Sequence, residues 1–254
     1  SVIPIGVLLA MYAHGMRRRW YIVGTAVFTL VTLLTFSRNG WLTLAVEATV
    51  LLVALARAHG YTWRRVLLWA APVVVAAGAI IGIFSMTSIV RSSNMNRLQL
   101  TAIALAQFRA HPFVGAGVGT FQEAVAQDKW YIADYGEPQE AHGLVQKTIA
   151  ETGAFGLLTF LWLLVAILAY MVRVYVRAQA APAWRFILLA LVCATAGSMV
   201  FQFFNTSYFV SKLWLPLGVA IAAARLAERG IVLRTANNES RITNHGIDPV
   251  LRHS

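Results

Sequence analysis

The chain has little charge and almost no cysteine. Only 12% of its 254 residues are charged, whereas 59% are hydrophobic, a balance that excludes an ordinary soluble domain. The single cysteine, Cys193, excludes an internal disulfide and any multi-cysteine metal site. Acidic residues are scarce as well, with 10 Asp and Glu against 21 Lys and Arg. We therefore expect an integral membrane protein.

Most of the apolar residues lie in runs near the length needed to cross a bilayer, about 17 to 25 residues. Six runs have this character, at 20–36, 41–57, 66–84, 154–172, 184–204 and 209–224. A shorter run at 1–13 lacks the order of a signal peptide. We interpret it as the end of a truncated helix, which makes the chain the C-terminal part of a longer protein. The predicted fold is all-α, a polytopic transmembrane domain over 1–229 with six complete spans.

Basic residues lie at alternate ends of these runs, in four groups. The groups are Arg17 to Arg19, Arg57 with Arg64 and Arg65, Arg173 with Arg177 and Arg185, and Arg225 with Arg229. Such ends face the cytoplasm, so topology accounts for the net charge of +11 without a nucleic-acid partner. The long segment 85–153 is then external. The tail 230–254 is polar and aperiodic, which predicts a disordered cytoplasmic end.

The external segment should be partly helical. A helix is expected at about 95–110, with Arg97 in its first turn, and a second at 140–152, ended by Gly153. Between them lies PFVGAGVGTF, residues 112–121. No strand precedes this stretch and no Gly-Lys-Ser/Thr follows it, so we interpret it as a glycine-rich turn and not as a phosphate-binding loop.

Three motifs follow one another along the chain: SRNG at 37–40, the glycine-rich stretch at 112–121 and HGLVQKTIAETGAFG at 142–156. In this order they resemble the O-antigen ligase and O-antigen polymerase superfamily, over about residues 20–225. The usual patterns there are Ser-Arg-Gly, Pro-Leu-Gly-x-Gly-x-Gly-x-Phe and His-Asn-x-x-Leu-Gln-x-x-x-Glu-x-Gly-x-x-Gly. Two departures are the inserted Asn39 and Gly143, which replaces the usual Asn.

This resemblance implies a multi-pass glycosyltransferase of the bacterial inner membrane, with its active site on the periplasmic face. It would move a glycan, without metal or cofactor, from an undecaprenyl-pyrophosphate carrier to an acceptor hydroxyl. The acceptor would be another glycan, the lipid A-core of lipopolysaccharide or a protein, and no residue pattern chooses among them.

Arginine is suited to the proposed leaving group. A lipid pyrophosphate gains negative charge as its bond to the glycan breaks, and guanidinium binds phosphate oxygens bidentately without losing its charge. Arg38 lies in a turn too short to leave the membrane interface, and Arg97 begins the first external helix. We expect both to bind the pyrophosphate. The alternatives are an interfacial arginine for Arg38 and an exposed helix charge for Arg97.

His142 is the candidate general base, because an acceptor hydroxyl needs a group that takes its proton near neutral pH. The alternative is a histidine at a helix start, bonded to loop carbonyls. Glu140 is the next candidate base. Glu47 lies about 9 to 10 Å inside the outer end of its span, where it is either a structural partner or part of the site. Trp130 and Tyr131 could stack on sugar rings or anchor the chain at the interface.

Two other functions fit a charged membrane protein. A transporter or flippase for lipid-linked glycans predicts repeats and paired broken helices, neither of which the sequence contains. A non-catalytic membrane component would not need His and Arg converging on an external segment. The enzyme is therefore the favoured interpretation.

The topology can be tested by cysteine labelling. Asp128→Cys should react with a membrane-impermeant thiol reagent in intact spheroplasts, because every arginine-rich end lies on the opposite face. Labelling that requires lysis would contradict the predicted orientation.

Overall fold

The computed structural model describes residues 2–35, 37–58, 60–62, 64–65, 88–178, 182–205 and 211–245, together with 68, 71–72, 75 and 78. Within these residues the chain is all-helical, as predicted. The helices are α1 (Ile3–Tyr12), α2 (Gly15–Leu34), α3 (Arg38–Ala58), α5 (Ser88–Ala110), α6 (Thr120–Gln127), α7 (Lys129–Tyr135), α8 (Leu144–Arg177), α9 (Pro182–Phe203) and α10 (Ser211–His245).

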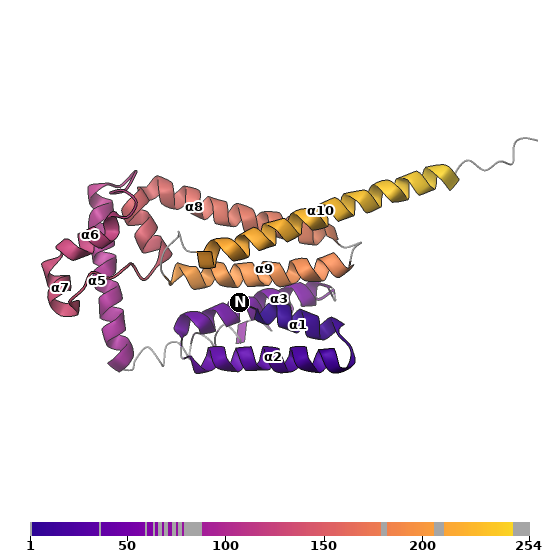
Figure 1. Ribbon diagram of the computed structural model, residues 1–254, viewed down its shortest axis with the longest axis horizontal. Helices are drawn as coiled ribbons and strands as arrows, with labels where there is room; N and C mark the ends of the chain where they lie inside the picture. Colours follow the sequence, from indigo (N-terminus) through magenta and orange to yellow (C-terminus); the bar gives the residue numbers. More distant parts are fainter. Residues whose placement is uncertain are drawn as a thin grey trace, which may run out of the picture.

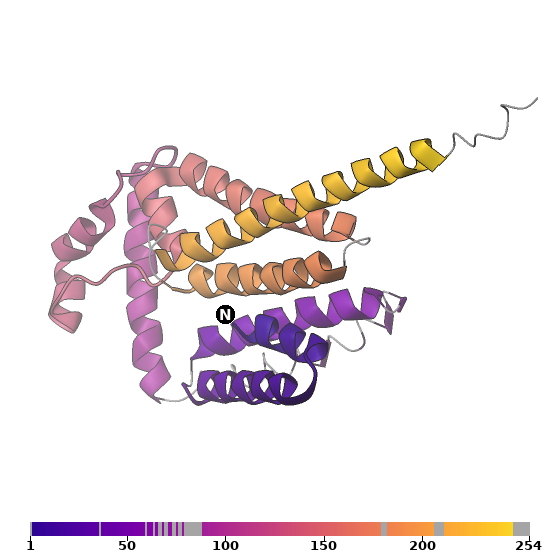
Figure 2. The same ribbon diagram turned by 45° about the vertical axis from the view of Figure 1, so that its right-hand side comes forward.

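The helices form a bundle with a cap at one end. Helices α1, α2, α3, α8, α9 and α10 run side by side, whereas α5 crosses the end of the bundle (Figures 1 and 2). We call residues 88–143, which include α5, α6 and α7, the cap. Helix α9 contacts α1, α3, α8 and α10, and its residues Leu188, Val192 and Cys193 are buried among them. The cap has a core of its own around Leu100, Phe121 and Tyr131.

Three described helices are long and apolar enough to cross a membrane: Arg38–Ala58, Leu144–Arg177 and Trp184–Phe203. They coincide with the predicted spans 41–57, 154–172 and 184–204. Large apolar side chains of α8 point outward, as expected for a surface that faces lipid. Trp162, for example, is 70% exposed.

The structure covers the other three predicted spans to different extents. Helices α2 and α10 cover 20–36 and 209–224 for the most part, whereas most of 66–84 lies outside the described residues. The membrane-helical fold is confirmed, and the count of six spans stays a prediction.

The C-terminal part differs from the expectation of disorder from residue 230. Helix α10 continues to His245. The stretch 231–245 contains neither glycine nor proline, and the next helix breaker is Gly246. Polarity suggested a disordered tail, but the absence of breakers allows an existing helix to extend. Residues 246–254 lie outside the described part.

Glu47 lies at the interface between α3 and α9. Its side chain is buried, with only 2% of the residue exposed, and a Cβ on Gly197 of α9 would overlap its carboxylate. Glu47 is nine residues from Arg38 on the same helix, or about 13 Å along the axis. Its position in the structure is therefore a helix contact at a distance from the candidate residues of the cap.

Candidate functional site

Helix α8 is broken at Gly153, whose φ and ψ of 64° and −165° are not helical. In an unbroken helix the N–H groups of Ala154 and Phe155 would donate to the carbonyls of Ala150 and Glu151. The break leaves these four backbone groups without their helical partners. A buried backbone group without a hydrogen bond is costly, so another segment must supply the partners.

The glycine-rich loop supplies all four. Its residues Ala116 and Gly117 donate to the carbonyls of Ala150 and Glu151, at 3.0 and 2.9 Å. In return, the N–H groups of Ala154 and Phe155 donate to the carbonyls of Pro112 and Phe113, at 2.8 and 3.2 Å. The second and third sequence motifs are thus one hydrogen-bonded unit, which we call the splice.

Glycine is required on both sides of the splice. Gly115 and Gly153 have φ values of 72° and 64°, which L side chains rarely adopt. A Cβ on Gly115 would overlap the backbone of Glu151, and a Cβ on Gly153 would overlap that of Phe113. The predicted glycine-rich turn is confirmed. Its Gly115 allows the loop backbone to approach the backbone of α8 closely.

The splice continues into α6. Gly119 precedes this helix with a φ of 88°, and the N–H of the buried Phe121 donates to Glu151 Oε1 at 3.3 Å. The carboxylate of Glu151 therefore ties the start of α6 to the first half of α8.

A buried lysine connects this unit to the histidine segment. Lys147 is 2% exposed, and its Nζ lies 2.5 Å from Glu140 Oε2 and 3.7 Å from Glu151 Oε1. The sequence analysis did not single out Lys147. Its i,i+4 spacing from Glu151 was the available signal. Counted from His142, the Gln of the family pattern falls on Lys147, a further departure from that pattern.

His142 lies just before α8, not inside it. The predicted helix start at 140 is wrong, because the helix begins at Leu144, after an extended Gly143 with φ −155° and ψ 134°. A Cβ on Gly143 would come within 3.3 Å of the Phe203 carbonyl, so the end of α9 crowds the position where the family usually has Asn. The ion pair with Lys147 draws Glu140 toward α8 and leaves 140–143 as a non-helical lead into it.

Arg97 interacts with both of the other predicted site residues, Arg38 and His142. Arg38 is the first residue of α3, and its Nη1 donates to Asn94 Oδ1 of α5 at 2.9 Å. Burial, and then the charge of Arg38, lower the pKa of Arg97. Burial, and then the charge of Arg97, lower the pKa of His142 from its usual 6.5. Arg97 is thus close enough to both Arg38 and His142 for their charges to interact, and we call the three residues the Arg–His cluster.

The electrostatics of this cluster favour an anion. Two guanidinium groups held near each other repel, and Arg97 Nε is buried without a hydrogen-bond partner among the described residues. A bound anion would offset both costs. The remaining candidates lie elsewhere: the Glu140 carboxylate is engaged by Lys147, and Glu47 is at the α3–α9 interface. In the described part of the chain, no three His, Cys, Asp or Glu side chains are placed to hold a metal ion.

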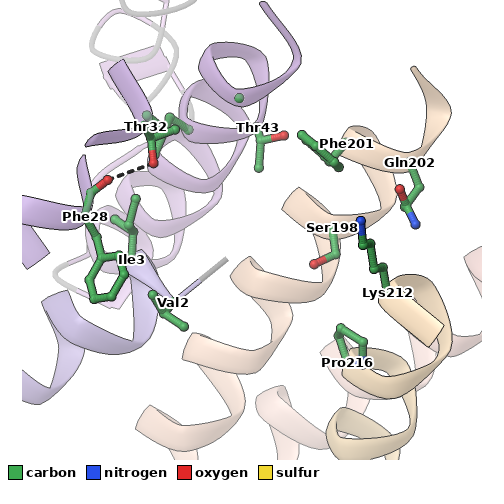
Figure 3. A pocket seen from close by; sticks show the side chains of 12 residues that line it. Val2, Ile3, Phe28, Thr32, Thr43, Ser198, Phe201, Gln202, Lys212 and Pro216 are labelled. Carbon is green, nitrogen blue, oxygen red and sulfur yellow. Dashed lines mark hydrogen bonds between the residues drawn. The ribbon is translucent and has the colours of Figure 1, made fainter. Parts of the chain in front are cut away.

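A pocket of about 480 Å³ lies between α1, α2 and α3 on one side and α9 and α10 on the other (Figure 3). Its walls are mainly apolar, and Gly40, two residues from Arg38, lines it. Lys212 and Gln202 add polar groups (Figure 3). Next to it, Asn39 Nδ2 donates to the Phe204 carbonyl at 3.0 Å, which ties the start of α3 to the end of α9.

Comparison with known families gives one match. The model of a family described as O-antigen ligase matches residues 22–161, more than half of the 254-residue chain. The matched region contains the whole Arg–His cluster and the splice. No curated protein matches the chain.

Lys147 can be tested by substitution. Lys147→Met keeps the length of the side chain but leaves two carboxylates, one fully buried, without their cation. We expect a loss of about 3–5 kcal/mol in stability, the usual cost of breaking a buried pair, seen as a lower thermal midpoint in detergent. Lys129→Met is the control, because Lys129 is exposed, and it should unfold like the wild type. Equal midpoints for both variants would contradict a supporting role for Lys147.

Proposed function

Because the chain belongs to the O-antigen ligase family, which comprises membrane glycosyltransferases of the ligase or polymerase type, we propose the following reaction for it. The protein transfers a glycan from undecaprenyl pyrophosphate to an acceptor hydroxyl, at the outer face of the bacterial inner membrane. The acceptor belongs to another glycan, the lipid A-core or a protein. The observation that carries the proposal is the pair of hydrogen bonds that bring Arg38 of α3 and the first turn of α8 to α5, from Arg38 to Asn94 and from Gln146 to Thr101. Arg97 lies on α5 between these two contacts, and its charge acts on His142.

The arginines bind the pyrophosphate. As the bond between the glycan and phosphate breaks, its electron pair stays on the phosphate oxygen, and the leaving group gains negative charge. Fixed guanidinium groups stabilise that charge without having to reorganise. Their positive charge lets the reaction proceed without a metal ion. Asn94, which accepts a hydrogen bond from Arg38, orients one of the two guanidinium groups.

His142 accepts the proton of the acceptor hydroxyl while the hydroxyl oxygen forms the new bond to the sugar carbon. This role requires a neutral imidazole. The lowered pKa of His142 supports it, because burial and the charge of Arg97 both disfavour the imidazolium ion. The pyrophosphate anion formed in the same step then offsets the charge that the imidazole gains.

The prenyl chain of the donor occupies the apolar pocket of Figure 3. Gly40, two residues from Arg38, lines the pocket, so a pyrophosphate bound at Arg38 would lie close to it. Apolar walls suit a hydrocarbon chain, and the Lys212 amine attracts the charged end of the lipid. The donor would thus bind with its chain in the bundle and its glycan toward the cap.

A transporter function is less well supported. A broken helix in a transporter presents its freed backbone groups to a substrate or ion. In α8 the four groups freed at Gly153 are hydrogen-bonded to the glycine-rich loop, so they are not available to a ligand.

The pH dependence of transfer tests His142. The wild-type rate should rise with pH and level off above the pKa of His142, because only the neutral imidazole acts as a base. The midpoint should lie below 6.5, the usual value. His142→Gln keeps a hydrogen-bonding side chain but is no base. It should transfer the glycan about 10² to 10⁴ times more slowly, and its rate should no longer rise with pH. Initial rates with a labelled donor between about pH 5 and 8 measure both effects.

His111→Gln is the matched control, since His111 is exposed at the end of α5, and it should keep the wild-type profile. A His142→Gln variant with the wild-type rate and pH profile would show that position 142 only orients its neighbours. Glu140 would then be the next candidate base.

A further inference from the structure

The cap contains a cleft that the proposed reaction does not use. The cleft has a volume of about 440 Å³ and lies between α5 and the corner where α6 meets α7. Its α5 side is formed by residues of one helix face, spaced by three or four along two rows: Gln99, Ala102 and Ala106, and Gln99, Ile103 and Gln107.

This face is turned away from the Arg–His cluster. At 3.6 residues per turn, Gln99 and Ala106 lie roughly opposite Arg97 and Thr101 on α5. Thr101 contacts Gln146 of α8, and Arg97 acts on His142. The cleft is therefore separated from the cluster by the width of one helix, about 10 Å.

The lining of the cleft combines apolar and polar side chains. Its alanines, Ala102, Ala106 and Ala124, leave room for a flat group, and Gln127 and Asp128 add polar groups from the α6–α7 corner. A sugar ring has the matching chemistry, because it carries hydroxyl groups around an edge and C–H groups on its faces.

Two glutamines in the cleft have unused acceptors. Gln99 Nε2 donates to Asp134 Oδ2 at 3.0 Å, and Gln107 Nε2 donates to the Thr120 carbonyl at 3.3 Å. The Oε1 atoms of both are buried and have no hydrogen-bond partner in the part of the chain that the structure describes. Both residues line the cleft and their terminal amide torsions are soft, so these oxygens are the candidate acceptors for a hydroxyl donor there.

Trp130 lies at the edge of the cleft, 84% exposed. The corner that carries it is well fixed. Asp128 Oδ1 accepts the Tyr131 N–H at 2.9 Å, and the Tyr131 hydroxyl donates to Asn96 Oδ1 at 2.8 Å. Gln127 and Lys129 beside it are exposed. A large aromatic side chain held open on a rigid, polar corner is a ready stacking surface.

We propose that this cleft is a carbohydrate subsite. Trp130 stacks on the face of one sugar ring, and Gln99, Gln107 and Asp128 accept hydrogen bonds from its hydroxyl groups. The inference rests on the proposed function, which supplies a glycan as substrate. The bound sugar is distant from the bond that breaks, so it is a unit farther along the donor glycan or the acceptor glycan.

The same tryptophan could in principle anchor the cap to lipid. The neighbouring groups favour sugar, because Asp128 would be repelled by anionic head groups and amide groups gain nothing from hydrocarbon. Membrane anchoring is therefore an outcome that the test must separate.

The test is a binding titration with the full chain in detergent. The probe is the lipid-free oligosaccharide released by mild acid from the lipid-linked glycans of the source cells. Wild-type protein should bind it, and so should His142→Ala, because the cleft is separate from the base. Trp130→Ala should weaken binding at least threefold, about the lower range for an aromatic contact, whereas Trp130→Phe should retain most of it. The control is Trp162→Ala, which removes a similarly exposed tryptophan from α8 and should bind normally.

Unchanged affinity in Trp130→Ala, or no binding by the wild type, would overturn the subsite. A Trp130→Ala variant that binds the oligosaccharide normally but whose cap no longer binds liposomes would also overturn the subsite, because it would show that Trp130 anchors the cap to lipid. In transfer assays, a raised KM for the donor would identify the donor glycan as the occupant, and a raised KM for the acceptor would identify the acceptor glycan; either supports the subsite. Wild-type binding without any glycosyl transfer would defeat the proposed function and leave the subsite standing.

Discussion

The splice at Gly153 is the constraint on which the site depends. A helix of 34 residues is interrupted, and the four backbone groups freed by the break are all paired with the glycine-rich loop. This exchange fixes where the first half of α8 points and where the loop enters α6. His142 lies just before that half helix, and Arg97 lies on α5, which packs against it. Without the hydrogen bonds to the loop, nothing at the break would fix the angle between the two halves of α8.

Ion pairs also connect the segments that the splice joins. Lys147 joins Glu140, two residues before His142, to Glu151 inside the broken helix. Glu151 in turn accepts a hydrogen bond from Phe121 at the start of α6. The buried lysine offsets part of the charge of the two carboxylates. By contrast, the Arg–His cluster concentrates positive charge, which favours an anion.

The sequence was informative where the signal is local. Apolar runs located three helices that can cross a membrane, and glycine spacing identified the turn at 112–121. Family motifs pointed to Arg38 and His142, and the expected external helix pointed to Arg97, whose charge acts on both in the fold. Contacts between distant segments were not predictable in this way. Nothing local at Gly153 indicates that Pro112 and Phe113 will accept its neighbours' N–H groups, and Lys147 could not be told from an exposed lysine before its two partners were known.

Some local signals were also misleading. The start of α8 was placed at 140 because the residues there favour helix, but the ion pair of Glu140 and the extended Gly143 delay it to Leu144. At the other end, polarity suggested disorder from 230, although α10 continues to His245 through a stretch, 231–245, that has neither glycine nor proline. Glu47 was recognised as unusual, but only the packing against Gly197 shows that it belongs to a helix interface.

The most direct measurement of the central claim follows the glycan itself. Full-length protein in liposomes would receive undecaprenyl pyrophosphate with an isotopically labelled glycan, together with candidate acceptors. The account predicts that the label becomes covalently attached to an acceptor and that free undecaprenyl pyrophosphate is released, with both products lost when Arg38 and Arg97 are replaced by alanine. Label that crosses the bilayer but stays on its lipid carrier would contradict glycosyl transfer and identify a flippase.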